Sequence, residues 1–389
     1  MKTVYLDNNA TTRIAPEALD AMSPYLGELY GNPSSMHAFG HGIRKALDEA
    51  RQKVAGLIGA EPEEIIFTGS GTEGDNTALM SAVSTSKGKD RIVTTEVEHH
   101  AVLNFIKRLE GKGKAKAVYL PVDGEGRLDM DAFRKSIDDK TAVVSVMFAN
   151  NETGVLFPVG EIGKVLRARG IPFHTDAVQA VGKVGIDVKK LDVDMLSLSG
   201  HKLHAPKGVG ALYVRRGLKF SPYLIGGGQE RGRRAGTENV ASIVGLGRAC
   251  ELAGERLDEE ARFIGALRDR LQLGLLRLPD AMVNGDRVNR LPNTTNMSFH
   301  YVDGEAILMK LDELGICVST GSACASGSPE PSHVLRAMSV PPTAIRGSIR
   351  FSLSRYNTES EIDATLDAMA GIVKGLRELS PYGPEKSFT

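Results

Sequence analysis

Residues 64–76 read EIIFTGSGTEGDN, an apolar run that passes through three glycines into a polar segment. The run 64–68 predicts a short buried strand, and the segment after the first glycines predicts a helix. A strand that leads through a glycine-rich turn into a helix is typical of α/β proteins. The expected fold class is therefore α/β.

The same alternation continues along the chain. Short runs rich in β-branched residues predict further strands at 91–95, 116–120, 142–148, 171–175, 194–199 and 209–214. Helical patterns separate several of them, for example at 99–109 and 160–169. Because strands joined through helices pair in parallel, we expect a large, mostly parallel sheet.

A second unit follows the first. A continuous helical pattern rich in charged residues covers 237–278 and predicts the point at which the chain leaves a large domain. Beyond about residue 277, further strands are predicted near 294–300, 316–319 and 348–352. We expect them to form a smaller α/β domain.

The composition fits a globular enzyme rather than a disordered or fibrous protein, with 25% charged and 41% hydrophobic residues. Lys+Arg and Asp+Glu both number 48, so the net charge of zero predicts neither a nucleic-acid nor a membrane-surface partner. Three cysteines cannot form a disulfide framework. The first residues, MKTVYLDNNATT, lack the apolar core of a signal peptide. We therefore expect a cytoplasmic protein with reduced thiols.

The glycine turn 69–74, GSGTEG, is open to three interpretations. Its G-x-G-x-x-G spacing, with Glu96 following 22 positions after Gly74, fits the dinucleotide turn of a nicotinamide-dependent dehydrogenase. Backbone N–H groups at a helix N-terminus bind a single phosphate ester equally well. Without a ligand, Glu73 and Asp75 would favour the helix dipole in a purely structural turn.

Polar residues follow three of the predicted strands, at 150–154 (NNETG), 174–179 (HTDAVQ) and 200–202 (GHK). Ligands of open parallel sheets bind at the carboxyl ends of the strands, so these groups are expected to converge on the glycine turn. Singly, they have structural interpretations: a turn, a helix cap at Asp176 and a solvated Lys202. Together they suit pyridoxal phosphate, which needs a lysine for a Schiff base and an acid at its ring nitrogen.

Ten segments occur in a specific order. They are YLDNNATT (5–12), YGNPSS (30–35), TGSGTEGDN (68–76), EHHAV (98–102), ANNETG (149–154), HTDAVQAVGK (174–183), SGHKLHAPKGVGALYV (199–214), RRAGTEN (233–239), STGSACASGS (319–328) and IRFSLSRYNT (349–358). In this order, over about residues 4–379, the chain resembles the NifS/IscS-type cysteine desulfurases, pyridoxal-phosphate enzymes of aminotransferase-like fold type I. The resemblance implies a large cofactor-binding domain at 13–256, a small domain at 1–12 and 257–379, and a tail at 380–389.

The resemblance also implies which residues bind the cofactor. Lys202 would form the Schiff base and later move the substrate Cα proton. Asp176 would pair with the ring nitrogen, and Gln179 would bond the ring hydroxyl. His99 would stack on the ring and act as an acid/base. The phosphate would be held by Gly71, Thr72, Ser199 and His201, and by Thr237 of the second subunit of a homodimer.

Substrate binding is implied for three further residues. Asn151 would contact the cofactor or the substrate near the ring. Arg350 would bind the α-carboxylate of L-cysteine, since planar bidentate recognition of a carboxylate suits arginine. Asn32 is a plausible helper of Arg350.

Cys324 is the expected nucleophile. It lies in 319–328, where six of ten residues are Ser or Gly, a composition that predicts a flexible solvated loop and is also compatible with an incidental thiol. The resemblance, to the subgroup with the longer cysteine loop, implies that the Cys324 thiolate takes sulfur from L-cysteine, giving L-alanine and a persulfide. Cys250 and Cys317 lie in apolar patterns and are expected to be structural.

Other functions stay open from the residues alone. A selenocysteine lyase or an aminotransferase would keep Lys202 without needing Cys324, and a non-catalytic scaffold would need neither. The pairs His99–His100 and His201–His204 have no third ligand at metal-site spacing, so no metal is expected. The expected sulfur acceptor is a protein such as an iron–sulfur scaffold. The chain after 379 resembles only the start of the longer tail with which IscS-type members dock that scaffold, which puts docking of that kind in doubt.

Overall fold

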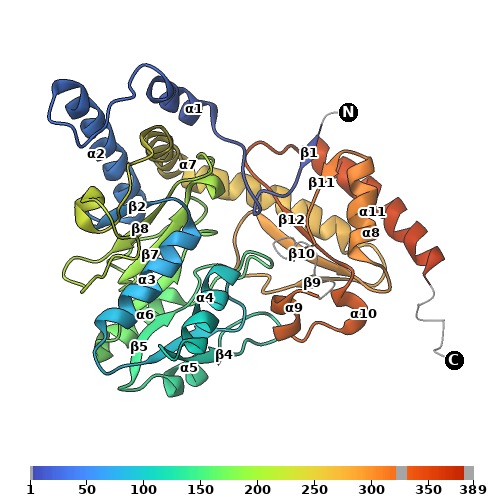
Figure 1. Cartoon of the computed structure of the whole chain (residues 1–389). Helices are drawn as coiled ribbons and strands as arrows, with labels where there is room; N and C mark the ends of the chain where they lie inside the picture. Colours follow the sequence, from blue (N-terminus) through green and yellow to red (C-terminus); the bar gives the residue numbers. More distant parts are fainter. Residues whose placement is uncertain (1–2, 321–330, 381–389) are drawn as a thin grey trace.

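The computed structural model describes residues 3–320 and 331–380 (Figure 1). Within these ranges, the larger sheet has seven strands in the spatial order β2 (Ile65–Thr68), β8 (Gly210–Val214), β7 (Met195–Ser199), β6 (Phe173–Asp176), β5 (Thr141–Ser145), β3 (Arg91–Thr95) and β4 (Lys116–Leu120). Each of these strands lies in or overlaps a run where the sequence predicts one. The predicted run 142–148 extends past the end of β5 at Ser145.

The sheet is mixed rather than wholly parallel. β8 pairs antiparallel with both β2 and β7, while the other neighbours pair in parallel. The segment between β7 and β8 holds only the short 3-10 helix η3 (Gly200–Lys202). Without a crossover helix the chain returns in the opposite direction, so the expectation of parallel pairing is wrong at this strand.

Helices cover both faces of this sheet, because alternate strand residues point to opposite sides. Ile66 and Leu212 pack with α3 (Gly71–Thr85) and α4 (His100–Gly111). Phe67 and Tyr213 belong to the opposite core. The helices that line this second core are α1 (Pro16–Met22), α2 (Ala38–Ile58), α5 (Met130–Ser136), α6 (Val159–Arg169) and the first half of α7 (Val240–Leu275).

A separate hydrophobic core surrounds a smaller sheet. Its strands are β9 (Ala281–Asn284), β10 (Thr294–Phe299) and β12 (Ser348–Ser352), antiparallel in the order β12-β10-β9, with β1 (Val4–Tyr5) and β11 (Ile316–Cys317) paired in parallel alongside. Its longer helices are α8 (Gly304–Glu313) and α11 (Glu359–Leu379). The shorter elements of the described chain are α9 (His333–Ala337), α10 (Pro342–Ile345), η1 (Ser23–Leu26), η2 (Pro62–Glu64) and η4 (Gln229–Gly232).

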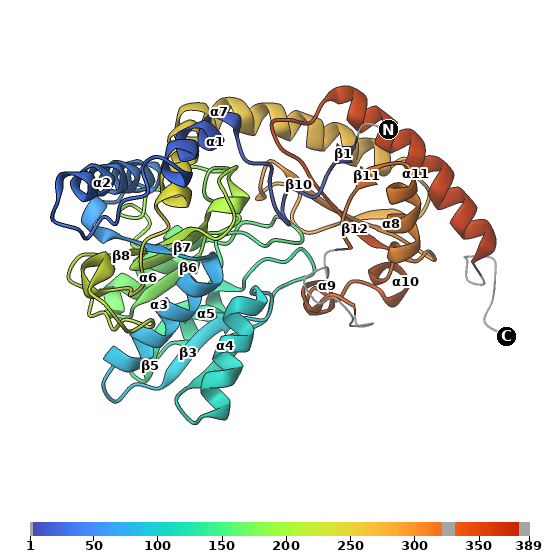
Figure 2. The same ribbon diagram turned by 45° about the horizontal axis from the view of Figure 1, so that its top comes forward.

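Helix α7 joins the two cores (Figure 2). Its first half buries Ile243 and Leu246 in the core of the larger sheet, and its second half buries Leu267 and Leu271 in the core of the smaller one. The helix lies within the predicted helical run 237–278. No helix in the described ranges is both long and apolar enough to cross a membrane.

A buried ion pair ties α2 to η4. The Arg51 guanidinium donates to both carboxylate oxygens of Glu230, at 2.7 and 2.8 Å, and to the carbonyl of Ile65 at 2.9 Å. Glu230 also accepts the backbone N–H of Phe67 at 2.9 Å. The pair therefore fixes β2, whose last residue precedes the glycine turn.

We expect Arg51→Met to lower the free energy of unfolding by about 3–5 kcal/mol, because it leaves the Glu230 carboxylate buried without its partner. The double variant Arg51→Met/Glu230→Met should lose much less. Urea denaturation followed by circular dichroism measures both. As a control, Lys45→Met removes an exposed pair with Glu49 on the same helix and should change stability by less than about 1 kcal/mol. A single variant as stable as the double one would contradict this account.

Candidate functional site

A cavity of about 330 Å³ opens at the carboxyl ends of β6 and β7, beside the start of α3. This volume is in the range of small-molecule sites. The lining residues come from segments far apart in the sequence: Asn9, Ala10, Ser70, Gly71, Thr72, Asp75, His99, Met147, Ala149, Asn151, Asp176, Val178, Gln179, Ser199, His201, Lys202 and Arg350. The predicted convergence of the strand-end polar groups on the glycine turn is confirmed.

The first turn of α3 forms one end of the cavity. Gly71 and Thr72 are its first two residues, so their backbone N–H groups have no partner within the helix. Ser70 caps the helix through its Oγ, which accepts the N–H of Glu73. A Cβ on Gly71 would come within 2.5 Å of a methyl group of Val178, so only glycine allows this approach. Such a helix start suits an anionic group.

Asp176 lies at the end of β6, is 7% exposed, and accepts the N–H of Val178 at 2.9 Å. Burial raises the pKa of its carboxyl to about 7, and the nearby Asp75 carboxylate adds to the rise. A carboxyl with this pKa is readily held ionised by a cation placed beside it. Asp176 is therefore suited to pair with a protonated ring nitrogen.

Lys202 ends η3, and its ammonium donates to the carbonyls of Asn9 at 2.5 Å and of Ala10 at 2.8 Å. Gln179, 6% exposed, donates its amide N–H to the same Asn9 carbonyl at 3.0 Å. The two side chains thus share one acceptor at the edge of the cavity.

His99 caps α4, and its Nδ1 accepts the N–H of Ala101 at 3.1 Å. Burial, followed by repulsion from the charge on Lys202, lowers its pKa to about 4. Because Nδ1 accepts, the ring proton of neutral His99 lies on Nε2. Burial and Lys202 likewise lower the pKa of His201 to about 4, so both rings are uncharged at neutral pH.

Arg350, on β12, brings a cation from the smaller sheet to the cavity. It donates to the carbonyl of Asn151 at 3.0 Å and to the carboxylate of Asp7 at 2.8 Å. Its Nε is buried and, within the described part of the chain, has no hydrogen-bond partner. The guanidinium is only 4% exposed and is held in one orientation, which suits the binding of a carboxylate in the cavity.

Two predicted site residues lie elsewhere, and a third falls outside the described ranges. Asn32 is exposed, and its carboxamide oxygen accepts the N–H of Ser34 rather than facing the cavity. Thr237 is exposed and lines a different pocket of about 110 Å³ near Glu230 and Arg234. Cys324 lies outside the described residues.

Asn9 and Asp75 are among the lining residues that were not predicted as site residues. Asn9 lies in the segment 5–12, and no pattern among the neighbouring residues indicates that it lines a cavity. Asp75 was assigned only to the helix dipole, yet it is 1% exposed and lines the cavity. Its position four residues after Gly71 on one helix could have placed it on the cavity side.

The dinucleotide interpretation of the glycine turn is wrong. Four strands separate β2, which leads into the turn, from β3, which leads to Glu96. Glu96 is exposed and does not line the cavity, so it cannot contact a ribose held at the turn. Within the described ranges, no group of three or more His, Cys, Asp or Glu side chains is arranged to hold a metal ion.

Pyridoxal phosphate fits the donors present. An anion site at Gly71 and Thr72, a carboxyl at Asp176 and an amine at Lys202 line one cavity, and their chemistry matches a phosphate, a ring nitrogen and an aldehyde.

Comparisons with known proteins identify the family of this chain. The model of the family "Aminotransferase class-V" matches residues 4–365. The chain is 56% identical over 383 residues to a cysteine desulfurase of Trichormus azollae, covering 98% of this chain and 96% of that protein. It is 55% identical over 384 residues to the cysteine desulfurase NifS of Azotobacter vinelandii, covering 98% and 95%.

A solved structure of a NifS-like protein superposes with a TM-score of 0.91 at 41% identity, covering 96% of this chain and 100% of that one. The expected aminotransferase-like fold is therefore confirmed. The chain belongs to the aminotransferase class-V family and, within it, to the NifS-type cysteine desulfurases.

Proposed function

We propose that this chain is a pyridoxal-phosphate-dependent cysteine desulfurase, which converts L-cysteine to L-alanine and transfers the sulfur to Cys324 as a persulfide. The observation that carries the proposal is the convergence of Lys202, Asp176 and Arg350 on one cavity, from three separate parts of the chain. Family membership supports the same reaction.

The cofactor would be held at both ends. The N–H groups of Gly71 and Thr72, with Ser199 and His201, would bind its phosphate, and Asp176 would pair with its ring nitrogen. Gln179 and Asn151 would contact the ring and its hydroxyl. When bound, pyridoxal phosphate supplies an electron sink that stabilises negative charge on the substrate Cα.

The chain's own groups would bind the substrate and move its protons. Arg350 would bind the α-carboxylate, with its orientation fixed by Asp7 and Asn151. Lys202 Nζ would remove and return the proton at Cα. His99, neutral at physiological pH, would exchange a proton with the substrate thiol through Nε2.

The two described cysteines support Cys324 as the nucleophile. Burial raises the pKa of the Cys250 thiol to about 12, and burial also raises that of Cys317, so both are poor thiolates. In the proposed step, the Cys324 thiolate attacks the substrate sulfur: an S–S bond forms, the substrate Cβ–S bond breaks, and a proton completes the methyl group of alanine. Free cysteine and Cys324 thus give alanine and a persulfide, with no other reactant.

The partners and compartment follow from this chemistry. Thr237 is exposed and lies outside the cavity of its own chain, which supports its proposed contact with the phosphate of a second subunit in a homodimer. The persulfide would pass to an acceptor protein such as an iron–sulfur scaffold. A free catalytic thiol calls for a reducing compartment, in keeping with a cytoplasmic enzyme.

The purified protein should carry a visible absorption band that changes when L-cysteine is added, and should form one alanine per sulfur released. Lys202→Ala should lose at least 10³-fold in rate, since it removes the proposed base at Cα, a step for which general acid–base catalysis contributes about 10²–10⁴-fold. Absorbance and amino-acid analysis provide the measurements. A protein that stays colourless when incubated with pyridoxal phosphate would refute the function.

Cys324→Ala should keep the visible absorption band but form no persulfide, because only the sulfur acceptor is lost. Mass spectrometry of the protein after one addition of L-cysteine detects the added sulfur. Cys317→Ala is the matched control and should gain the persulfide as the wild type does. Sulfide release from L-cysteine at the wild-type rate in Cys324→Ala would count against the assigned nucleophile.

Arg350→Gln should raise the KM for L-cysteine about 10- to 100-fold with a smaller fall in kcat, the range expected for losing a charge-assisted hydrogen bond. Steady-state kinetics separate the two constants. The control is Arg346→Gln, an exposed arginine four residues before Arg350 that does not line the cavity. An unchanged KM would place the carboxylate elsewhere.

A further inference from the structure

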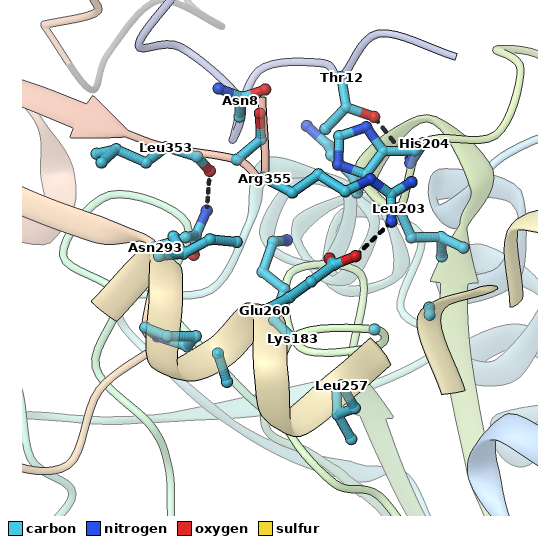
Figure 3. A pocket seen from close by; sticks show the side chains of 17 residues that line it. Asn8, Thr12, Lys183, Leu203, His204, Leu257, Glu260, Asn293, Leu353 and Arg355 are labelled. Atoms are coloured by element: carbon cyan, nitrogen blue, oxygen red, sulfur yellow. Dashed lines mark hydrogen bonds and ion pairs between the residues drawn. The ribbon is translucent and has the colours of Figure 1, made fainter. Parts of the chain in front are cut away.

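A second, smaller cavity of about 30 Å³, which we call the rear chamber, has Lys202 among its lining residues. Figure 3 shows this chamber with Lys183, Glu260 and Arg355. It is bordered by Lys183 and Lys202, by His204, and by the second half of α7 with the chain after β12. Glu260 and Arg355 form an ion pair at 2.7 Å on one side of it. Lys202 lines both cavities, so the rear chamber adjoins the amine that the proposed reaction uses.

Lys183 contacts Gln179 from the side of the rear chamber. Its ammonium donates to the Gln179 backbone carbonyl at 2.9 Å and to the carboxamide oxygen Oε1 at 3.4 Å. An ammonium has no acceptor atom, so it selects the oxygen end of the amide. The amide N–H₂ must then point the other way, where one N–H reaches the Asn9 carbonyl that Lys202 also uses.

The charge on Lys183 is unusual. Although it keeps some accessible surface at the rear chamber, its amine lies deep within the protein, and this burial, followed by repulsion from Lys202, lowers its pKa to about 7. Among the described residues, no carboxylate forms an ion pair with it. The charged or titratable groups that face it are Lys202, His201, His204, Glu260 and Arg355. Glu260 is already paired with Arg355, and both histidines are neutral, so Lys183 and Lys202 act on each other as like charges.

We propose that Lys183 is a positioning residue for the desulfurase reaction: from the rear chamber it fixes the orientation of the Gln179 amide and disfavours the charged form of the Lys202 amine. The first effect turns the Gln179 N–H₂ away from the rear chamber and keeps one N–H on the Asn9 carbonyl at the edge of the cavity. The second resembles the activation of other catalytic lysines by a neighbouring cation. The proposal rests on the proposed function, since it concerns the amine that would bind the cofactor.

The test is a pH titration of the visible absorption of the bound cofactor, which reports protonation of the Lys202 nitrogen. Below about pH 7 Lys183 is charged and disfavours that protonation. Lys183→Met removes the repulsion and should raise the titration midpoint by about one pH unit. It should also speed release of the cofactor, because the Gln179 amide is no longer fixed.

Lys183→Arg keeps a cation that can only donate. Its midpoint should lie at or below that of the wild type, and its cofactor release should match the wild type. Lys190→Met is the matched control: it removes an exposed lysine that is paired with Asp187 on the same segment, and it should leave the midpoint unchanged.

Equal midpoints in Lys183→Met and wild type, with both folded by thermal denaturation, would overturn the proposal. If Lys183→Met does not fold, Lys183→Arg decides alone, and a midpoint raised above the wild-type value overturns it. The titration needs bound cofactor but no turnover. Failure of wild-type protein to form alanine would therefore refute the proposed function and leave the test of Lys183 intact.

Discussion

The hydrogen bonds of Asn9 hold together the segments from which the cavity is built. Its side chain is 1% exposed and fully used: Nδ2 donates to the Asn151 carbonyl and to Thr294 Oγ1, and Oδ1 accepts from Asn293. Its backbone carbonyl accepts from Lys202 and Gln179. One residue near the N-terminus thus links the larger sheet, which carries the proposed cofactor-binding groups, to the smaller sheet, which carries Arg350. A buried asparagine with every donor and acceptor paired specifies one arrangement of its neighbours.

Burial shifts the pKa values of two side chains in the cavity, and these shifts determine what the side chains can do chemically. Asp176 is held near a pKa of 7 and His99 near 4, both mainly by loss of water rather than by a single neighbour. A buried carboxyl of this kind is stabilised in its ionised form by a cation placed beside it, and a neutral imidazole can accept a proton. A protonated ring nitrogen placed beside Asp176 would therefore stabilise its ionised carboxylate. Such perturbed groups are typical of functional sites.

Much of this architecture follows from local sequence. The strand runs, the long helix α7 and the convergence of residues 150–154, 174–179 and 200–202 could be predicted, because buried strands have short β-branched patterns and their carboxyl ends share one edge. The direction of β8 was mispredicted, although the nine residues between the predicted strands 194–199 and 209–214 are too few for the crossover helix that parallel pairing needs. The strand β9 was missed, as half of its four residues are only partly buried. Asn9 and Asp75 were missed as cavity residues because their roles depend on partners distant in sequence.

The distribution of the site over two cores has a mechanical consequence. Arg350 is oriented by Asp7 and by Asn151, so the proposed carboxylate site draws on the N-terminal segment, the larger sheet and β12 together. Helix α7 runs through both cores and fixes their relative position with apolar packing at each end. Neither core alone would contain both a cofactor site and a carboxylate site. Reacting groups must be held within a fraction of an ångström. Packing along α7 and the hydrogen bonds of Asn9 therefore contribute to catalysis by fixing the positions of the groups that would touch the substrate.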